Sequence, residues 1–211
     1  MKKLNTLVLG FAVAMGFSGC IDDGDSFDAA AQYELERPIV RQYALNYLTM
    51  PDSINILGAQ LYYEVVNPGD PASYQYKTVP NPNNPSQDMV ELPDLTLIFE
   101  GSLIQSNDVV HSNEEAEGDE VSLSRNNLPT AWQAALLPQE IRYDEDGEPL
   151  SEPIEIGGIT RDGLKAGGII RIVSPSYLLY GNSSFGNIPA NSPMYYEIEV
   201  VNIEEPSSNS N

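Results

Sequence analysis

The sequence has little cysteine, histidine, tryptophan and positive charge. It contains one Cys, one His and one Trp, and its 10 Lys and Arg residues stand against 31 Asp and Glu residues, for a formal net charge of −21. A single Cys excludes an intramolecular disulfide, and one Cys with one His excludes the usual zinc-binding sets. The shortage of basic residues, with no basic patch, predicts that the protein does not bind nucleic acid.

Motifs for several enzyme classes are also missing. No glycine-rich phosphate loop is present, and a Ser-His-Asp arrangement would have to use His111. Asp144-Glu145-Asp146-Gly147 resembles the start of a calcium loop, but the further ligands and the terminal Glu are not at the required spacing. Acidic residues abound, yet no spacing singles out a pair for glycoside cleavage. We therefore expect no metal site, no cofactor and no triad hydrolase chemistry.

The first twenty residues have the pattern of an export signal. Lys2 and Lys3 precede an apolar run from Leu7 to Phe17, which is too short to span a bilayer comfortably. Phe17-Ser18-Gly19-Cys20 resembles a bacterial lipobox, which implies lipidation of Cys20 and removal of residues 1–19. The alternative is a free thiol in an uncleaved apolar segment. We predict a cell-envelope protein, anchored in the membrane through Cys20 at the periplasmic face or the outer-membrane surface.

An acidic tether and a helix follow. Residues 20–28 contain four Asp and indicate a solvated tether. Further on, Leu35, Ile39, Tyr43 and Tyr47 recur every four residues, which predicts a helix over 29–48 inside an N-terminal helical extension, 29–57. Pro38 should lie in a first turn or break this helix in two. The apolar stripe should pack on the domain that follows.

The rest of the chain indicates a β-rich domain over 58–205, with a frayed tail at 206–211. Residues 128–137 are its one clear helix, with Trp132 on the apolar side, and a long polar connection follows at 138–168. Strands around a single helix predict an α+β fold with a mostly antiparallel sheet. Strand-forming residues concentrate in four stretches, 61–66, 95–99, 169–173 and 194–203.

Four motifs, in order and at roughly the right spacing, resemble the FKBP domain of peptidyl-prolyl isomerases over about 61–204. Residues 97–103 (LIFEGSL) are similar to its Val-x-Tyr-x-Gly-x-Leu strand, and residues 128–132 (LPTAW) to its Val-Ile-x-Gly-Trp helix start. Pro175 with Tyr180-Gly181, then Ile188-Pro189 and the closing strand, are similar to its C-terminal half. The preceding helix and the Gly58-to-Tyr63 strand start resemble exported FKBP-like lipoproteins.

The resemblance implies a five- or six-stranded sheet wrapped around a short helix, with an apolar pocket between them. The chemistry of the family needs no nucleophile and no metal. Amide resonance holds the X–Pro bond planar behind a barrier of roughly 18–20 kcal/mol. A pocket that accepts the twisted, less polar amide better than the planar one lowers this barrier.

The resemblance also assigns roles to individual residues. Trp132 is expected to form the pocket floor, and Tyr180 to donate its hydroxyl to a substrate carbonyl at the rim. Phe99 replaces a usual Tyr on the wall, and Tyr196 replaces a usual Phe on the last strand. The expected substrate-binding residues are Leu128 through its backbone amide, Ile188 as an apolar lip, and Val110.

The sequence departs from the family at one pair of residues. The family's Phe-Asp pair, whose Asp supports catalysis electrostatically, falls on Val109-Val110 or on Val110-His111, and neither choice retains it. His111 is a polar candidate for the missing group, although a single His in a loop is more often solvated. The connection at 138–168 is longer than the family's usual one, and we expect a hairpin there.

The leading hypothesis is a peptidyl-prolyl isomerase that acts on proline-containing exported polypeptides, as a monomer anchored through Cys20. A second hypothesis is a binding module of the same fold that grips such segments without turning them over. The missing Phe-Asp pair favours this second hypothesis, while Trp132 and Tyr180 favour the enzyme. A third is a structural envelope lipoprotein in which the pocket has closed.

Overall fold

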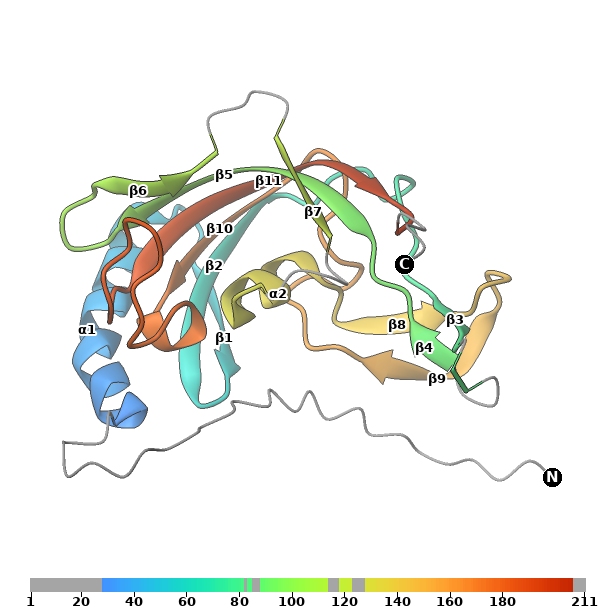
Figure 1. Cartoon of the computed structure of the whole chain (residues 1–211), viewed down its shortest axis with the longest axis horizontal. Helices are drawn as coiled ribbons and strands as arrows, with labels where there is room; N and C mark the ends of the chain where they lie inside the picture. Colours follow the sequence, from blue (N-terminus) through green and yellow to red (C-terminus); the bar gives the residue numbers. More distant parts are fainter. Residues whose placement is uncertain (1–27, 82, 85–87, 114–117, 123–127, 207–211) are drawn as a thin grey trace.

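A computed structural model describes residues 28–81, 83–84, 88–113, 118–122 and 128–206 (Figure 1). The predicted signal segment, Cys20 and most of the predicted tether therefore lie outside the described residues, as does the end of the tail from residue 207. Within the described part of the chain, no helix is both long enough and apolar enough to cross a membrane.

A curved antiparallel sheet forms the centre of the molecule (Figure 1). Six strands follow the order β1-β2-β10-β11-β5-β6, and a seventh, β7, pairs with β5 off this path. The predicted α+β class, with a mostly antiparallel sheet around a short helix, is confirmed. The strands are β1 (Asp52–Ile56), β2 (Ala59–Asn67), β5 (Asp94–Leu103), β6 (Val109–Ser112), β7 (Asp119–Ser122), β10 (Gly168–Ser174) and β11 (Met194–Glu204).

The concave face of the sheet covers α2 (Thr130–Leu136), as Figure 1 shows. Alternating residues of β11, such as Tyr196 and Ile198, point to this face and are fully buried. Of the seven residues of α2, five are buried, including Trp132 at 3% exposure. A helix this short has little stability of its own, so it depends on packing against the sheet.

The segment after α2 holds the helix in place. The carbonyl of Ala134 accepts from the Ile159 amide at 2.8 Å, and that of Leu136 accepts from the Leu164 amide at 3.0 Å. These bonds satisfy carbonyls that a helix end otherwise leaves unpaired. Part of the long connection thus works as a C-terminal support for α2.

Two small antiparallel pairs lie outside the main sheet. The long connection contains β8 (Glu140–Tyr143) paired with β9 (Pro149–Glu155). The chain before β5 contains β3 (Thr78–Pro80) paired with β4 (Asp88–Val90).

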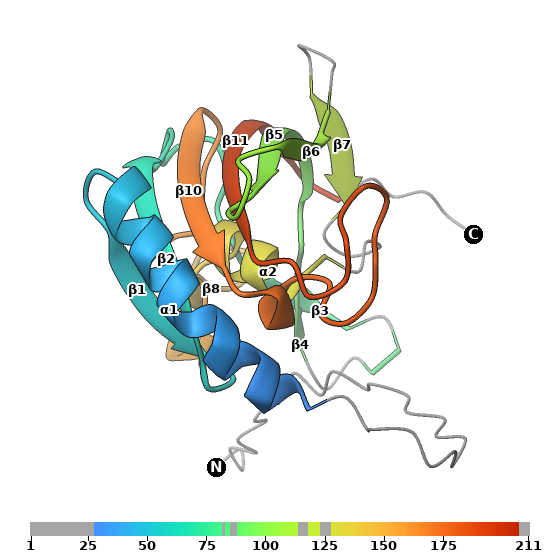
Figure 2. The same ribbon diagram turned by 90° about the vertical axis from the view of Figure 1, so that its left-hand side faces the viewer.

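The helix α1 (Ala29–Tyr47) packs on the opposite face of the sheet (Figure 2). Val40, Tyr43 and Ala44 from the helix meet Val173 of β10, which alternates with the α2-facing Ile172. Asp28 caps the helix, its carboxylate accepting from the amides of residues 30 and 31 at 3.0 Å.

The predicted apolar stripe of α1 is correct at Tyr43, which is buried, and wrong at its other three positions. Leu35, Ile39 and Tyr47 are 69%, 43% and 54% exposed, whereas Glu36 and Val40 are buried. The packed face contains a carboxylate, which a pattern of apolar residues cannot reveal. The buried Glu36 carboxylate is tolerated at this position because its oxygens accept hydrogen bonds from the amide and the hydroxyl of Ser176, at 2.8 and 2.6 Å.

Two further expectations for the N-terminal extension are corrected. Pro38 lies inside one continuous helix, neither in its first turn nor at a break. The helical segment ends at Tyr47, and residues 52–56 of the expected extension form the edge strand β1. The β1–β2 connection is a two-residue turn, Leu57-Gly58, with φ values of 51° and 87°, as a type I′ hairpin requires.

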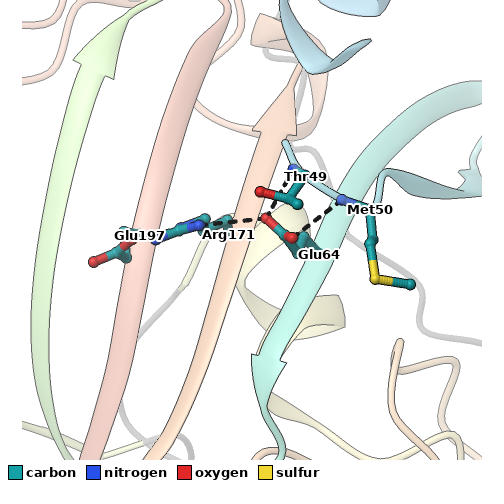
Figure 3. A network of polar contacts seen from close by, with 5 residues as sticks. All are labelled: Thr49, Met50, Glu64, Arg171 and Glu197. Carbon is teal, nitrogen blue, oxygen red and sulfur yellow. Dashed lines mark hydrogen bonds and ion pairs between the residues drawn. The ribbon is translucent and has the colours of Figure 1, made fainter. Parts of the chain in front are cut away.

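A polar row crosses the α1 side of the sheet (Figure 3). Arg171 of β10 pairs with Glu197 of β11 at 2.6 Å and with Glu64 of β2 at 3.4 Å. The Glu64 carboxylate also accepts from the amides of Thr49 and Met50, at 3.3 and 3.1 Å. This nearly buried carboxylate thereby fixes the chain where α1 leads into β1.

Candidate active site

Aromatic rings from several parts of the fold meet at one edge of the main core. The central ring is Trp132 of α2, which lies edge-on to Phe99 of β5 and to Tyr196 of β11, at centroid distances of 4.9 and 5.1 Å. Edge-to-face packing of this kind is favourable for aromatic pairs. The cluster is completed by His111 of β6 and by Tyr180 and Phe185 from the segment after the 3-10 turn η1 (Ser176–Leu178).

Three adjacent strands place Tyr196 beside His111. Tyr196 is opposite Gly101 on β5, and Gly101 is opposite His111 on β6. The glycine matters because a Cβ at position 101 would overlap the Tyr196 ring. Without a side chain at Gly101, Tyr196 reaches across β5, and its hydroxyl lies 2.8 Å from His111 Nδ1.

The environment of this pair is apolar. Burial lowers the pKa of His111 below its usual value, and burial raises that of Tyr196. Met194 Sδ also accepts from the Tyr196 hydroxyl at 3.6 Å. Burial raises the pKa of Tyr180 as well, and a hydrogen bond with Tyr196 partly offsets this rise. Polar groups in the cluster are therefore few, and the indole Nε1 of Trp132 is buried with no hydrogen-bond partner among the described residues.

The expectation of a solvated loop histidine is wrong. His111 belongs to β6, is half-buried, and contacts Phe99, Tyr180 and Tyr196 through its ring. Residues 114–117, which follow β6, lie outside the described part of the chain. Sequence reasoning named His111 as a polar candidate but missed the strand that contains it, because four residues give almost no periodic signal.

Phe185 is a residue that sequence reasoning did not assign to the site. Its ring stacks on Tyr180 at 4.5 Å with an interplanar angle of 6°, and it contacts His111 at 5.6 Å. Phe185 is 50% exposed, so it covers the outer side of the cluster. Gly181 and Gly186 flank it with φ values of 58° and 54°, a conformation that glycine adopts without strain. The sequence signal that could have indicated Phe185 was an aromatic residue between two glycines.

The predicted substrate-binding residues all lie in the main core or pack against it. Ile188 is 1% exposed, and it exchanges backbone hydrogen bonds with Phe185 at 2.8 and 3.0 Å. Leu128 and Val110 are half-buried against the main core, and the Leu128 carbonyl accepts from the Gln133 side chain at 2.7 Å. Ile188 is thus tied to the cluster through Phe185, while Leu128 and Val110 are shown only to pack on the main core. Their individual roles remain predictions.

Two surface hollows lie elsewhere, beside the β8–β9 hairpin. Their volumes are about 600 and 260 Å³, and Tyr74 lines both. The smaller one also adjoins Lys165, a buried ammonium that donates to the Tyr74 carbonyl at 2.5 Å and whose pKa burial lowers to about 8. The larger one adjoins the Asp144–Gly147 turn, where the Asp144 carboxylate accepts backbone amides of its own turn.

Comparison with a curated relative agrees with the FKBP resemblance that the four sequence motifs indicate. No family model matches the sequence. The FKBP-type peptidyl-prolyl cis-trans isomerase FkpA of Buchnera aphidicola subsp. Baizongia pistaciae is 27% identical over 110 residues. The chain resembles an FKBP-type isomerase. The matched stretch is 52% of this chain and 33% of FkpA, so the chain spans about a third of that relative's length.

Solved FKBP and related isomerase structures overlap the chain at modest scores. A peptidyl-prolyl isomerase from Pseudomonas syringae pv. tomato has a TM-score of 0.45 at 15% identity, over 86% of this chain and 100% of the other. FkpA from Escherichia coli has a TM-score of 0.46 at 15% identity, over 84% and 63%. AtFKBP13 has a TM-score of 0.43 at 16% identity, over 67% and 90%.

Proposed function

We propose that the protein is a peptidyl-prolyl cis-trans isomerase that assists the folding of exported envelope proteins. One observation carries the proposal: Trp132, Phe99, Tyr196 and Tyr180, each named from the FKBP resemblance, meet in one aromatic cluster. They come from β5, α2, β11 and the segment after η1, which are far apart in the sequence. Their convergence supports a site rather than four separate packing positions.

The cluster suits rotation about an X–Pro amide. The planar amide is the more polar form, so an aromatic enclosure that excludes water destabilises it relative to the twisted form. In this proposal Trp132 offers the proline ring a flat apolar floor, and the Tyr180 hydroxyl donates to a carbonyl of the peptide. Phe185 must swing off Tyr180 for a peptide to enter, and its flanking glycines permit that movement.

A second function is favoured by two features of the site. Among the described residues of the cluster, the family's catalytic carboxylate has no equivalent, and His111 takes the polar position. In addition, Phe185 occupies the outer side of the cluster. A module that binds proline-containing segments without turnover needs only the aromatic floor and the hydroxyl.

Catalysis of isomerisation in a short X–Pro peptide tests the proposal, with Tyr180→Phe as the informative variant. This change keeps the ring and removes the hydroxyl, and a lost hydrogen bond of about 1–2 kcal/mol predicts a five- to thirty-fold lower kcat/KM. Tyr47→Phe on the outer side of α1 is the matched control and should leave the rate unchanged. An unchanged rate in Tyr180→Phe rejects the assigned role of this hydroxyl.

The proposed membrane anchor rests on Cys20, which follows the export-signal pattern of residues 1–19. If Cys20 carries the lipid, Cys20→Ala moves the protein from the membrane fraction to the soluble fraction of the envelope. Retention of the variant in the membrane fraction contradicts the anchor.

A further inference from the structure

The larger of the two surface hollows is separate from the aromatic cluster and has an acidic lining. Its walls come from residues 72–77, from the turn after β8 and from the end of β11. No residue of the aromatic cluster lines it, and Figure 1 places the β8–β9 hairpin and β6 toward opposite ends of the molecule. Five carboxylates and one ammonium line the hollow: Asp144, Glu145, Asp146, Glu204, Glu205 and Lys77.

Backbone contacts hold the walls of this hollow together. Lys77 forms a backbone bridge with Tyr143, the last residue of β8. In the turn that follows, the Asp144 carboxylate accepts from the amides of residues 146 and 148, at 3.0 and 2.9 Å. At the third wall, Ile203 is 5% exposed and belongs to the main core. The carboxylates at the mouth therefore stand on a frame that exists without a ligand.

The single ammonium of the lining is already neutralised. Lys77 Nζ lies 2.9 Å from the Glu205 carboxylate and 3.3 Å from that of Glu91. Among the ion pairs of the described residues, none includes the other four lining carboxylates except through the hydrogen-bonded turn of Asp144, so Glu145, Asp146 and Glu204 have no cationic partner. Such an excess of negative charge in a concave surface attracts a cation.

A second observation also points to a ligand. Tyr74 lines the hollow and is 7% exposed, and its hydroxyl is buried with no hydrogen-bond partner among the described residues. Burial raises the pKa of Tyr74, and the negative charges of Glu205 and Glu91 raise it further, as expected of a hydroxyl close to the acidic wall. Buried polar atoms usually have a partner. An N–H donor that enters the hollow supplies the one that this hydroxyl lacks.

The arrangement of the carboxylates indicates what kind of cation fits. Within the described ranges, no three acidic side chains are placed to hold a metal ion. Carboxylates spread over separate walls suit a planar cation with N–H donors in several directions. A guanidinium has five such donors, pairs with carboxylates through parallel hydrogen bonds, and stacks on aromatic rings. An ammonium has three donors and is more strongly hydrated.

We propose that the larger hollow binds the guanidinium group of an arginine-type ligand, with Asp146 and Glu204 as its carboxylate partners and Tyr74 beneath it. This is a second binding site, and it does not rest on the proposed function of the aromatic cluster. The guanidinium belongs either to an arginine side chain of a polypeptide or to a free small molecule, and the two sources share the same recognition chemistry.

Calorimetric titration of the purified protein with acetyl-arginine amide tests the site, beside acetyl-citrulline amide, which has the same shape without the charge. The arginine derivative should bind saturably and at least tenfold more tightly. Asp146→Asn combined with Glu204→Gln should lower its affinity at least tenfold, because charge-assisted hydrogen bonds are lost. Tyr74→Phe should lower the affinity about three- to tenfold without destabilising the fold, since its hydroxyl has no partner in the free protein.

The matched control is Glu34→Gln combined with Glu152→Gln. It removes the same charge at two exposed positions outside the hollow and should leave the affinity unchanged. Circular dichroism checks that all variants fold. Losses confined to the hollow variants support the inference. Equal losses in the two double variants overturn it, because the net charge of the chain then explains the binding. Absence of saturable binding, or equal binding of the citrulline analogue, overturns it as well.

The source of the guanidinium is identified by comparing acetyl-glycyl-arginyl-glycine amide with methylguanidinium. Tighter binding of the tripeptide assigns the hollow to basic polypeptides, and tighter binding of methylguanidinium assigns it to a small guanidine; either result supports the site. The tripeptide contains no proline, so its binding is independent of isomerisation. Arginine binding without catalysis rejects only the proposed function, and catalysis without arginine binding rejects only this inference.

Discussion

At the scale of single residues, the site depends on a glycine as much as on its aromatic rings. Gly101 matches the glycine of the family's strand motif, yet the motif alone does not explain it. In the structure, its missing side chain is the space that the Tyr196 ring fills. This chain has Phe99 where the family usually has Tyr, and Tyr196 where the family usually has Phe. The two exchanges compensate each other, because the tyrosine hydroxyl enters the cluster from β11 instead of β5.

Gly101→Ala should destabilise the protein by about 1–3 kcal/mol, because the new methyl group overlaps the Tyr196 ring. Urea unfolding followed by Trp132 fluorescence measures the change. In a Tyr196→Ala background the same substitution should cost clearly less, since the overlap is gone. Equal costs in the two backgrounds contradict the claim that Tyr196 needs this glycine.

Acid should weaken the fold partly through His111. Its pKa is lowered in the folded protein, so the unfolded chain binds the proton more tightly. Stability is therefore unaffected above about pH 6.5 and falls as the pH drops through the folded-state pKa. Unfolding free energies from pH 7.5 to 5 should decline more steeply in the wild type than in His111→Asn. If the unfolding free energies of the two proteins decline equally with pH, His111 does not contribute to the loss of stability in acid.

At the scale of elements, α1 is more than a spacer between a tether and a domain. Glu36 reaches from the helix to Ser176 at the start of η1, four residues before Tyr180. The apolar cluster of α1 with β10 gives the helix its position, and the carboxylate connects that position to the loop of the site. The helix thereby supports the site from the opposite face of the sheet.

Removing this carboxylate tests the connection. Glu36→Ala leaves the amide and hydroxyl of Ser176 without their buried acceptor and should cost about 2–4 kcal/mol. It should also weaken peptide binding at the Tyr180 loop. Glu34→Ala is the matched control, because its exposed pair with Arg37 is worth at most about 1 kcal/mol. Equal stability losses in the two variants refute the role of Glu36.

At the scale of the whole molecule, the long alternating strands and the Trp-containing helix could be predicted from the sequence, because their periodicity and composition are strong. β2, β5, β10 and β11 all fall on predicted stretches. The aromatic residues carried over from the family motifs also meet in space. The fold class and the centre of the site were therefore within reach of sequence reasoning.

The remaining features depend on contacts that no local pattern encodes. His111 entered the site through a pairing in which β6 has a bulge beside it. Phe185 was visible only as an aromatic in a polar loop, and the packed face of α1 was concealed by Glu36. Each of these residues is explained by a partner distant in the chain, so none is recovered from spacing alone.

The proposed catalysis of X–Pro rotation by the aromatic cluster can be measured by exchange NMR on a proline-containing peptide, with the soluble 21–211 chain at substoichiometric concentration. We expect cis–trans exchange well above the uncatalysed rate, reduced by Tyr180→Phe and unaffected by Tyr47→Phe. Peptide signals that broaden on binding, with no faster exchange from a folded protein, would contradict it and leave a binding module.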